Sequence, residues 1–193
     1  NRAAGFLGFQ RQTQLAQQTA ITTRRLDDIE DLPPCDLLKI DIQGGEVEVL
    51  HGGPMALRDA VAIIPKVRFY RLYNHETMFA GIDQALRSMG FALHKIMASK
   101  SIQVRHSRIA DVRPRRIGSQ LVDGDAVYIR NIETLERISD DQWHHLAILS
   151  DSVFQSFDLT LHCLDHLAAR GLVEQTAIDA YVDLLPGSLV LAQ

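Results

Sequence analysis

The chain lacks the features that mark several large classes of protein. None of its apolar runs approaches the roughly 20 residues that cross a bilayer, and its first residues do not resemble a secretory signal. Its net charge of −4 argues against a nucleic-acid-binding protein that depends on overall basicity. It also lacks the Gly-X-Ser-X-Gly elbow of hydrolases and the phosphate loop of nucleotide triphosphatases. We therefore expect neither a membrane nor a nucleic acid among its partners.

Cysteine is scarce, and the two copies lie far apart in the sequence. Cys35 stands in a predicted loop before a strand, and Cys163 lies within a predicted helix. So few cysteines are typical of a reducing compartment, and we expect a cytoplasmic protein. The sequence alone leaves a disulfide between them open.

Apolar sequence is plentiful, and its pattern changes along the chain. The hydrophobic share of 46% suffices for one domain with an appendage or for two small domains. Residues 1–18 are polar and rich in Gln, which predicts an irregular N-terminal segment. Residues 19–131 alternate predicted strands and helices, which indicates an α/β domain. The pattern of residues 139–187 predicts helices only, and the first of them begins at the capping box Ser139-Asp140-Asp141-Gln142.

The most informative segment is a strand that leads through a glycine-bearing turn into a helix. The strand is predicted over 37–42, the turn over 43–45 and the helix over 46–50. Open α/β sheets bind ligands at the carboxyl ends of their strands. Asp41 and Gln43 stand at that position.

Several further elements are expected on either side of this segment. A proline inside the second long strand predicts a bulge or a sheet edge at Pro65. Residues 98–124 are basic and irregular. The other expected elements are strands at 19–24, 61–70, 91–96 and 125–130, a helical turn at 26–32, and helices at 78–89, 140–150, 152–169 and 174–185.

Two motifs carry a resemblance to a known family. They are Leu26-Asp27-Asp28 and the run from Lys39 to Leu50, Lys-Ile-Asp-Ile-Gln-Gly-Gly-Glu-Val-Glu-Val-Leu. Together they resemble the FkbM-type family of S-adenosylmethionine-dependent methyltransferases. The likeness continues at Leu72-Tyr73, Met78-Phe79, Gly90-Phe91-Ala92-Leu93 and the segment from Gly124 to Arg130. It implies a partial doubly wound, Rossmann-like sheet with a terminal antiparallel strand, followed by a C-terminal helical extension.

The resemblance also implies a reaction and a site. The expected reaction moves a methyl group from S-adenosylmethionine to an oxygen of a small molecule or saccharide. Asp41 is the expected proton acceptor, Gln43 the positioning residue, and Gly44 the residue beside the methyl donor. The loop 70–76, with Tyr73 and His75, is the candidate acceptor side.

Each of these sites has a structural alternative. Asp41 is equally well placed to cap the helix that follows it. Asp27 and Asp28 are equally well placed as acids in the first turn of a short helix. The loop 70–76 is either part of the site or merely solvated. The arginines between 105 and 116 form either a contact for an anionic substrate or a solvated loop. His162 and His166 lie four residues apart but lack further ligands, so no metal site is expected.

The chain departs from the family pattern at two positions and lacks one element. Gln43 stands where the family usually has Glu, and Lys66 stands near where it usually has an acidic residue. The glycine-rich turn that binds the donor is missing, since Gly5 and Gly8 form no such motif. With Asn1 in place of an initial Met, these features predict the carboxyl-terminal part of a longer methyltransferase.

Two consequences follow from a missing amino-terminal half. The strand at 37–42 would have an exposed edge, and we expect self-association through that edge or through the helical tail. An alternative function is that of a degenerate, non-catalytic interaction domain.

Overall fold

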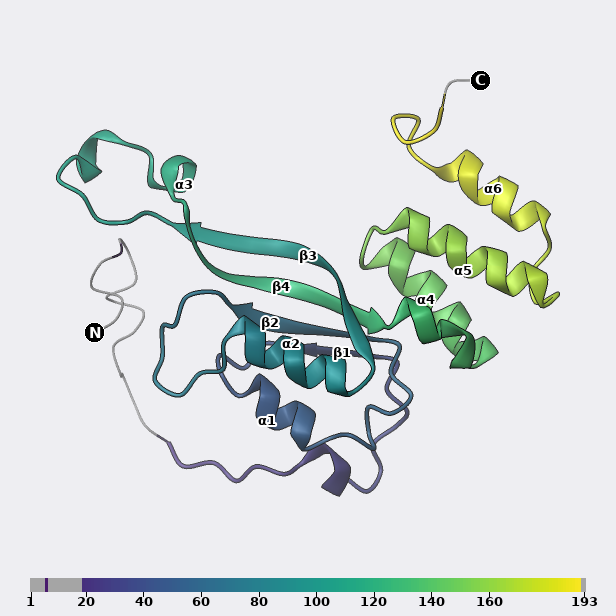
Figure 1. The fold of residues 1–193 in the computed structure, drawn as a ribbon, viewed down its shortest axis with the longest axis horizontal. Helices are drawn as coiled ribbons and strands as arrows, with labels where there is room; N and C mark the ends of the chain where they lie inside the picture. Colours follow the sequence, from purple (N-terminus) through teal and green to yellow (C-terminus); the bar gives the residue numbers. More distant parts are fainter. Residues whose placement is uncertain (1–5, 7–18, 192–193) are drawn as a thin grey trace. The chain divides into compact units, whose positions relative to one another are not determined.

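The computed structural model of the chain describes Phe6 and residues 19–191 (Figure 1). The molecule divides into two compact units, Asn1–Ile132 and Glu133–Gln193. The segment 1–18, expected to be irregular, lies outside the described residues except for Phe6. That residue is buried and forms an isolated antiparallel bridge with Val104.

The first unit contains a mixed sheet with the strand order β1-β2-β4-β3 in the described part of the chain. β1 (Leu37–Ile40) runs parallel to β2 (Ala62–Arg68). β4 (Gln120–Arg130) is antiparallel to both β2 and β3 (Phe91–Ile102). The fold is therefore mixed α/β, and its last strand is antiparallel, as the sequence predicts.

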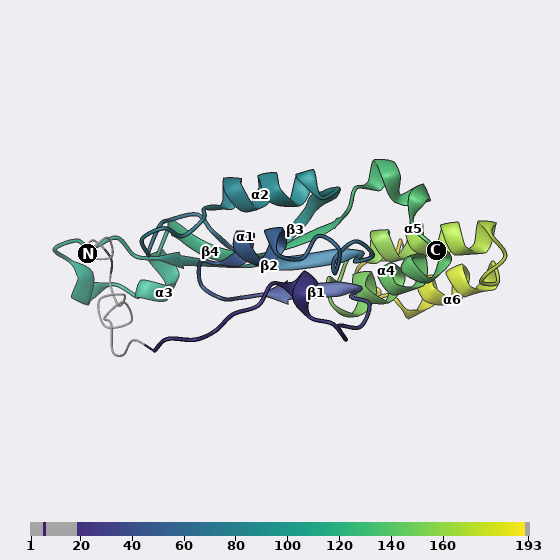
Figure 2. The same cartoon turned by 90° about the horizontal axis from the view of Figure 1, so that it is seen from below.

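Two helices pack on one face of this sheet, α1 (Glu46–His51) and α2 (Phe79–Ser88). Figure 2 shows α2 lying along that face. Their apolar side chains meet alternate residues of the strands, because successive strand residues point to opposite faces. Leu50 of α1, Ile82 and Leu86 of α2, and Ile63 and Val67 of β2 are fully buried in one cluster. The even-numbered residues of β2, including Lys66 and Arg68, consequently point to the other face.

The helix predicted at 78–89 is confirmed, and so is the turn that stops it. Met78 and Met89 are the cap residues of α2, and Gly90 has a φ of 86°. That conformation suits glycine, which has no Cβ to clash with the backbone. The chain then enters β3, which continues six residues beyond the predicted end at residue 96.

The region predicted to be irregular, 98–124, is mostly an extension of two strands. β3 reaches Ile102 and β4 starts at Gln120, so only 103–119 lies outside them. That remainder contains η3 (Ile109–Asp111) and α3 (Pro114–Ile117). The two long strands form an arm with a basic tip, seen at the end of β3 and β4 in Figure 1.

Three local predictions are wrong. Residues 19–24 are extended and exposed but form no strand, because β propensity alone does not supply a pairing partner. The expected turn at 26–32 is only the short η2 (Leu26–Asp28), ahead of the restricting pair Pro33-Pro34. Pro65 lies in a central strand without a bulge, since the register between β2 and β4 is the same on both sides of it.

The second unit contains three α-helices after the short η4 (Ile132–Arg137): α4 (Asp140–Ser152), α5 (Phe157–Ala169) and α6 (Thr176–Leu184). The predicted capping box begins α4. The backbone N–H of Gln142 donates to Ser139 Oγ at 3.2 Å, and that of Ser139 donates to Gln142 Oε1 at 2.8 Å. None of the helices in the described residues is long and apolar enough to span a membrane.

Aromatic packing and a buried thiol mark the interior of this unit. The imidazole of His166 stacks on the buried Trp143 with ring centroids 4.1 Å apart, and His162 lies edge-on to the same ring at 5.9 Å. The described residues contain no group of ligands suited to a metal ion. Both Cys35 and Cys163 are free thiols, and burial raises the pKa of Cys163 to about 12.

Candidate functional site

A glutamate of α1 holds the turn that follows β1 in place. The buried carboxylate of Glu46 accepts hydrogen bonds from the backbone N–H groups of Gly44, at 2.9 Å, and Ile42, at 3.3 Å. Gly45 is the N-cap of α1, and no side chain caps the helix. Asp41 is therefore not the helix cap that its position also allowed. Its carboxylate is available for other contacts at the strand end.

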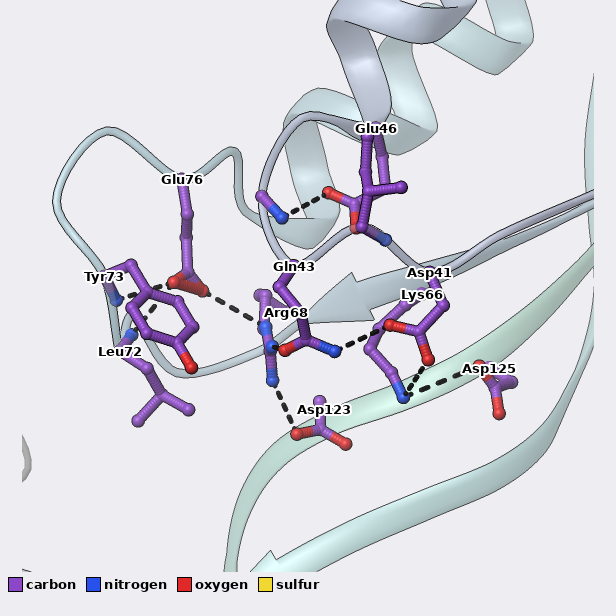
Figure 3. Close-up of polar contacts among 12 residues, drawn as sticks. Asp41, Gln43, Glu46, Lys66, Arg68, Leu72, Tyr73, Glu76, Asp123 and Asp125 are labelled. Atoms are coloured by element: carbon purple, nitrogen blue, oxygen red, sulfur yellow. Dashed lines mark hydrogen bonds and ion pairs between the residues drawn. The ribbon is translucent and has the colours of Figure 1, made fainter. Parts of the chain in front are cut away.

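Asp41 joins a lysine and an amide (Figure 3). Lys66 Nζ lies 3.1 Å from Asp41 Oδ2, and Gln43 Nε2 donates to Asp41 Oδ1 at 2.7 Å. Burial raises the pKa of Asp41, but the hydrogen bond and charge of Lys66, with help from Gln43 and Lys39, lower it further than burial raises it. The net effect keeps Asp41 ionised. Burial also lowers the pKa of Lys66, yet its carboxylate neighbours leave it raised overall.

A second ion pair extends this network along the sheet. Lys39 Nζ lies 2.7 Å from Asp125 Oδ1, and Lys66 Nζ lies 4.0 Å from the same oxygen. Lys66 thus stands between two carboxylates, Asp41 just past the end of β1 and Asp125 in the middle of β4. Lys39 and Lys66 together balance the two negative charges.

Arg68 is the buried centre of the network, with 4% of its surface exposed. Its Nη1 donates to Asp123 Oδ2 at 2.6 Å, and its Nη2 donates to Gln43 Oε1. Its Nε lies 3.3 Å from Glu76 Oε1, but the two atoms are not aligned for a hydrogen bond. Because burying an unpaired charge is costly, these carboxylates are what makes the buried guanidinium tolerable.

Glu76 connects this centre to the loop after β2. Its Oε2 accepts hydrogen bonds from the backbone N–H groups of Tyr73, at 2.7 Å, and Leu72, at 3.3 Å. The carboxylate is also buried, with 3% of the residue exposed. The loop is therefore held to the strand end by a buried ion pair and is not merely solvated.

The structure brings most of the predicted site residues together. A Cβ on Gly44, whose φ is 128°, would lie 3.1 Å from Glu76 Cβ, so the turn and the loop touch. Arg68 Cζ lies 5.9 Å from the centre of the Tyr73 ring. His75 is exposed, with a φ of 66°, and no contact joins it to the network among the described residues.

Sequence reasoning missed the central arginine and its carboxylates, although a signal for them exists. Lys66 and Arg68 alternate on β2, and Asp123 and Asp125 alternate on β4. The register pairs Lys66 with Asp125 and Arg68 with Asp123. Directly opposed residues of opposite charge stabilise an antiparallel pair. Two alternating charge motifs of opposite sign predict such a pairing once the strands are known to be neighbours.

The two residues that depart from the family pattern both contact the carboxylate of Asp41. Gln43 gives Asp41 a hydrogen bond and accepts one from Arg68, whereas an ionised Glu has no donor for Asp41. Lys66 gives the same Asp41 an ion pair. The substituted residues are thus integral parts of the network.

An open groove of about 530 Å³ lies beside the turn. Its walls combine arginines, carboxylates and apolar side chains from the segment before η2, from the turn and from α1. The lining residues are Thr23, Arg24, Arg25, Leu26, Asp28, Ile42, Gly45, Glu48, Val49 and Gly52. Such a mixture suits a ligand with hydroxyl groups and an apolar ring.

A comparison with protein families identifies the region that contains this turn. Residues 2–93 match the family model described as methyltransferase FkbM domain, a range that includes β1, α1, β2 and α2. Comparisons with curated proteins and with solved structures found no match. The resemblance carried by the two sequence motifs is thereby confirmed. Residues 2–93, slightly less than half of the chain, are thus similar to the FkbM methyltransferase domain family.

Proposed function

We propose that the chain is part of a methyltransferase that uses S-adenosylmethionine and methylates an oxygen of a small molecule or saccharide. The single observation that carries this proposal is the ionised Asp41 at the carboxyl end of β1, within a region of the FkbM domain. A carboxylate there is placed to accept a hydrogen bond from an acceptor hydroxyl. The reaction then depends chiefly on alignment of that oxygen.

Asp41 acts mainly as an orienting acceptor in this proposal. Its lowered pKa makes it a weak base, so it takes the hydroxyl proton only as the oxygen forms its new bond to carbon. Gln43 fixes the carboxylate through its 2.7 Å hydrogen bond, and Arg68 in turn fixes Gln43. Tyr73 and the exposed His75 remain the proposed acceptor-side residues.

The groove beside the turn fits the methyl donor in its chemistry. Asp28 and Glu48 would accept hydrogen bonds from ribose hydroxyls, and the half-exposed Ile42 would contact the base. Gly45 of the turn lines this groove, next to Gly44, the residue expected beside the donor. When bound, S-adenosylmethionine supplies an electrophilic methyl group.

The edge of the sheet at β1 supports the proposal that these strands are part of a larger fold. β1 pairs only with β2 among the described residues, so one of its edges has no partner there. We propose that the four strands are the carboxyl-terminal part of a doubly wound, Rossmann-like sheet whose remaining strands complete the donor site that begins at this groove, in a cytoplasmic protein. The intact network around Asp41 does not favour a degenerate, non-catalytic domain.

The first test is a calorimetric titration of S-adenosylhomocysteine, the demethylated donor, into the chain after circular dichroism has shown that it is folded. Loss of a hydrogen bond to a carboxylate costs roughly tenfold in affinity. We expect that effect from Asp28→Asn or Glu48→Gln. Glu30→Gln is the matched control, because Glu30 is an exposed acid of the same segment that does not line the groove. Equal affinity of all four proteins would contradict the donor site.

A methyl-transfer assay then separates binding from chemistry. Asp41→Asn keeps the shape of the side chain but loses its charge, so we expect donor affinity to stay and methyl transfer to a panel of hydroxylated saccharides to fall. Unchanged transfer by this variant would rule out the role of Asp41.

A further inference from the structure

The tip of the β3–β4 arm is strongly basic in an acidic protein. Seven lysines and arginines lie between residues 95 and 116, against the single acid Asp111, while the whole chain carries a net charge of −4. The tip lies beyond the last residue pair of β2 and β4, Arg68 with Asp123. It therefore projects past the end of β2 (Figure 1).

Three of the arginines at the tip form no ion pair in the described part of the chain. Arg108 pairs with Asp111 at 2.7 Å. Arg105, Arg113 and Arg116 are exposed, and no ion pair joins them to another side chain in the described residues. Two exposed apolar side chains accompany them, Val104 at 52% and Ile117 at 46%. The tip thus combines charge with apolar surface, as interaction sites often do.

Side chains within the tip also hold its backbone in place. Gln103 is buried, and its amide lies 2.6 Å from His106 Nε2. The backbone N–H of Arg108 donates to Nδ1 of the same imidazole at 3.2 Å. These contacts hold the imidazole against the backbone on which the arginines stand, and a fixed backbone lowers the entropy lost on docking.

The complementary charge lies in the helical unit. Ten acids and only two arginines occur between residues 133 and 193. Asp158 and Asp165 lie two turns apart on α5, and Asp179 and Asp183 lie one turn apart on α6. All four are exposed, and no ion pair is formed by them in the described part of the chain. Exposed leucines flank them, Leu184 at 81% and Leu172 at 41%.

We propose that the basic tip of one copy docks on the acidic helical unit of a second copy. The charges are opposite, and both surfaces carry exposed apolar side chains. This complementarity between two surfaces of the same sequence makes a second copy of the chain a suitable partner. This contact does not depend on methyl transfer.

Such a contact joins two different surfaces, so it is head-to-tail and produces a ring or an open chain of copies. Attraction between surface charges weakens as the Debye length falls from about 30 Å at 0.01 M salt to about 3 Å at 1 M. Sedimentation velocity of the full chain should therefore show mass that rises with protein concentration at low salt and a monomer at high salt. A monomer at both salt concentrations would overturn the proposal.

Charge reversal identifies the surfaces. The triple variant Arg105→Glu, Arg113→Glu, Arg116→Glu should weaken association at low salt by at least about tenfold, since like charges now face each other. The control is the triple variant Arg58→Glu, Arg71→Glu, Arg87→Glu, which changes the net charge equally at exposed arginines elsewhere. Equal loss in both variants would mean that only net charge matters, and the tip would not be the contact.

A mixing experiment decides whether the helical unit is the partner. The triple variant Asp158→Lys, Asp165→Lys, Asp179→Lys should weaken association by a similar factor. When it is mixed with the tip-reversed triple variant, the new glutamates of one variant again meet the new lysines of the other, and association should return. Two variants that are folded by circular dichroism but stay monomeric in the mixture would overturn the proposed pairing.

Discussion

Two arginines lie at opposite ends of the same sheet and have opposite kinds of partner. The buried Arg68 ends β2, and the half-buried Arg130 ends β4, which runs antiparallel to it. Arg68 contacts the side chains of Gln43, Glu76 and Asp123. Within the described residues, Arg130 donates to backbone oxygens, namely those of Ala60 at 2.7 Å, Met89 at 2.9 Å, Leu57 at 3.1 Å and Arg58.

One end of the sheet is held together through backbone groups, whereas the other is held together through polar and charged side chains. Arg130 also lies over the Phe91 ring, 4.1 Å from its centre, and joins the loop before β2 to the end of α2. Burial lowers the pKa of Arg130, with a smaller opposing effect of Asp59. Arg68 instead balances ionised groups, so its environment responds to charge. The Arg68 end presents the carboxylates on which the proposed reaction depends.

Removal of Arg68 should have the largest effect on stability. Arg68→Met leaves Glu76 and Asp123 without their cation, and breaking a buried ion pair costs about 3–5 kcal/mol. The loss comes from the uncompensated carboxylates, and urea unfolding at neutral pH measures it. Arg68→Lys, which keeps the charge, is the control and should lose less.

Removal of Arg130 should cost less. Arg130→Met leaves several backbone oxygens without donors and removes a cation–π contact, for a loss of about 3 kcal/mol. The lost partners are carbonyls, which carry no charge, so no buried ion is left uncompensated. A loss in urea unfolding larger than that of Arg68→Met would show that the two ends do not differ in this way.

The sequence predicts the fold wherever a local signal agrees with the final packing. The helix at 78–89 has an apolar face and a stopping glycine, and the capping box at Ser139 marks the start of α4. Residues 19–24 have β propensity but no partner strand, so the expected strand is absent. Pro65 lies in a central strand because the hydrogen bonds on either side of it hold that strand in the sheet. The residue type alone does not indicate this.

The candidate site is only partly predictable for a related reason. Asp41, Gln43 and Gly44 stand in one continuous motif, and their proximity follows from the chain itself. Arg68 meets Asp123 across 55 residues of sequence, and that contact depends on the pairing of β2 with β4. Long-range pairing of this kind is the part that local patterns leave undetermined.

Two glycines with positive φ extend the comparison to the backbone. Gly44 lies at the Arg68 end and Gly90 at the Arg130 end, with φ values of 128° and 86°. A Cβ on Gly44 would lie 3.1 Å from Glu76 Cβ, whereas one on Gly90 would lie 3.6 Å from Arg130 Nη1, an ordinary contact. We expect Gly44→Ala to cost about 2 kcal/mol and Gly90→Ala about 1 kcal/mol. Thermal unfolding compares them, and a larger loss for Gly90→Ala would reverse the ranking.

The smallest expected effect concerns Lys66, and it has a defined pH window. Burial raises the pKa of Asp41 but Lys66 lowers it by more, so the pKa of Asp41 in the folded chain lies below its unfolded value. This stabilisation is present above the unfolded Asp value of about 3.9 and is lost as the pH falls through the folded pKa. The raised pKa of Lys66 acts in the opposite sense, since its contribution is present below about 10.4 and is lost at higher pH.

Lys66→Met should therefore destabilise the chain only between about pH 4 and about pH 10. The loss should stay within about 1 kcal/mol, because the Asp41 side chain is 40% exposed and water screens the pair. NMR titration of the Asp41 carboxyl should show its pKa rising in the variant. Lys39→Met is the matched control, since Lys39 acts on Asp41 through its charge alone and pairs directly with Asp125. If both variants raised the pKa of Asp41 equally, the direct Lys66 contact would have no special weight, and the ionised state of Asp41 would reflect the general positive charge of this strand end.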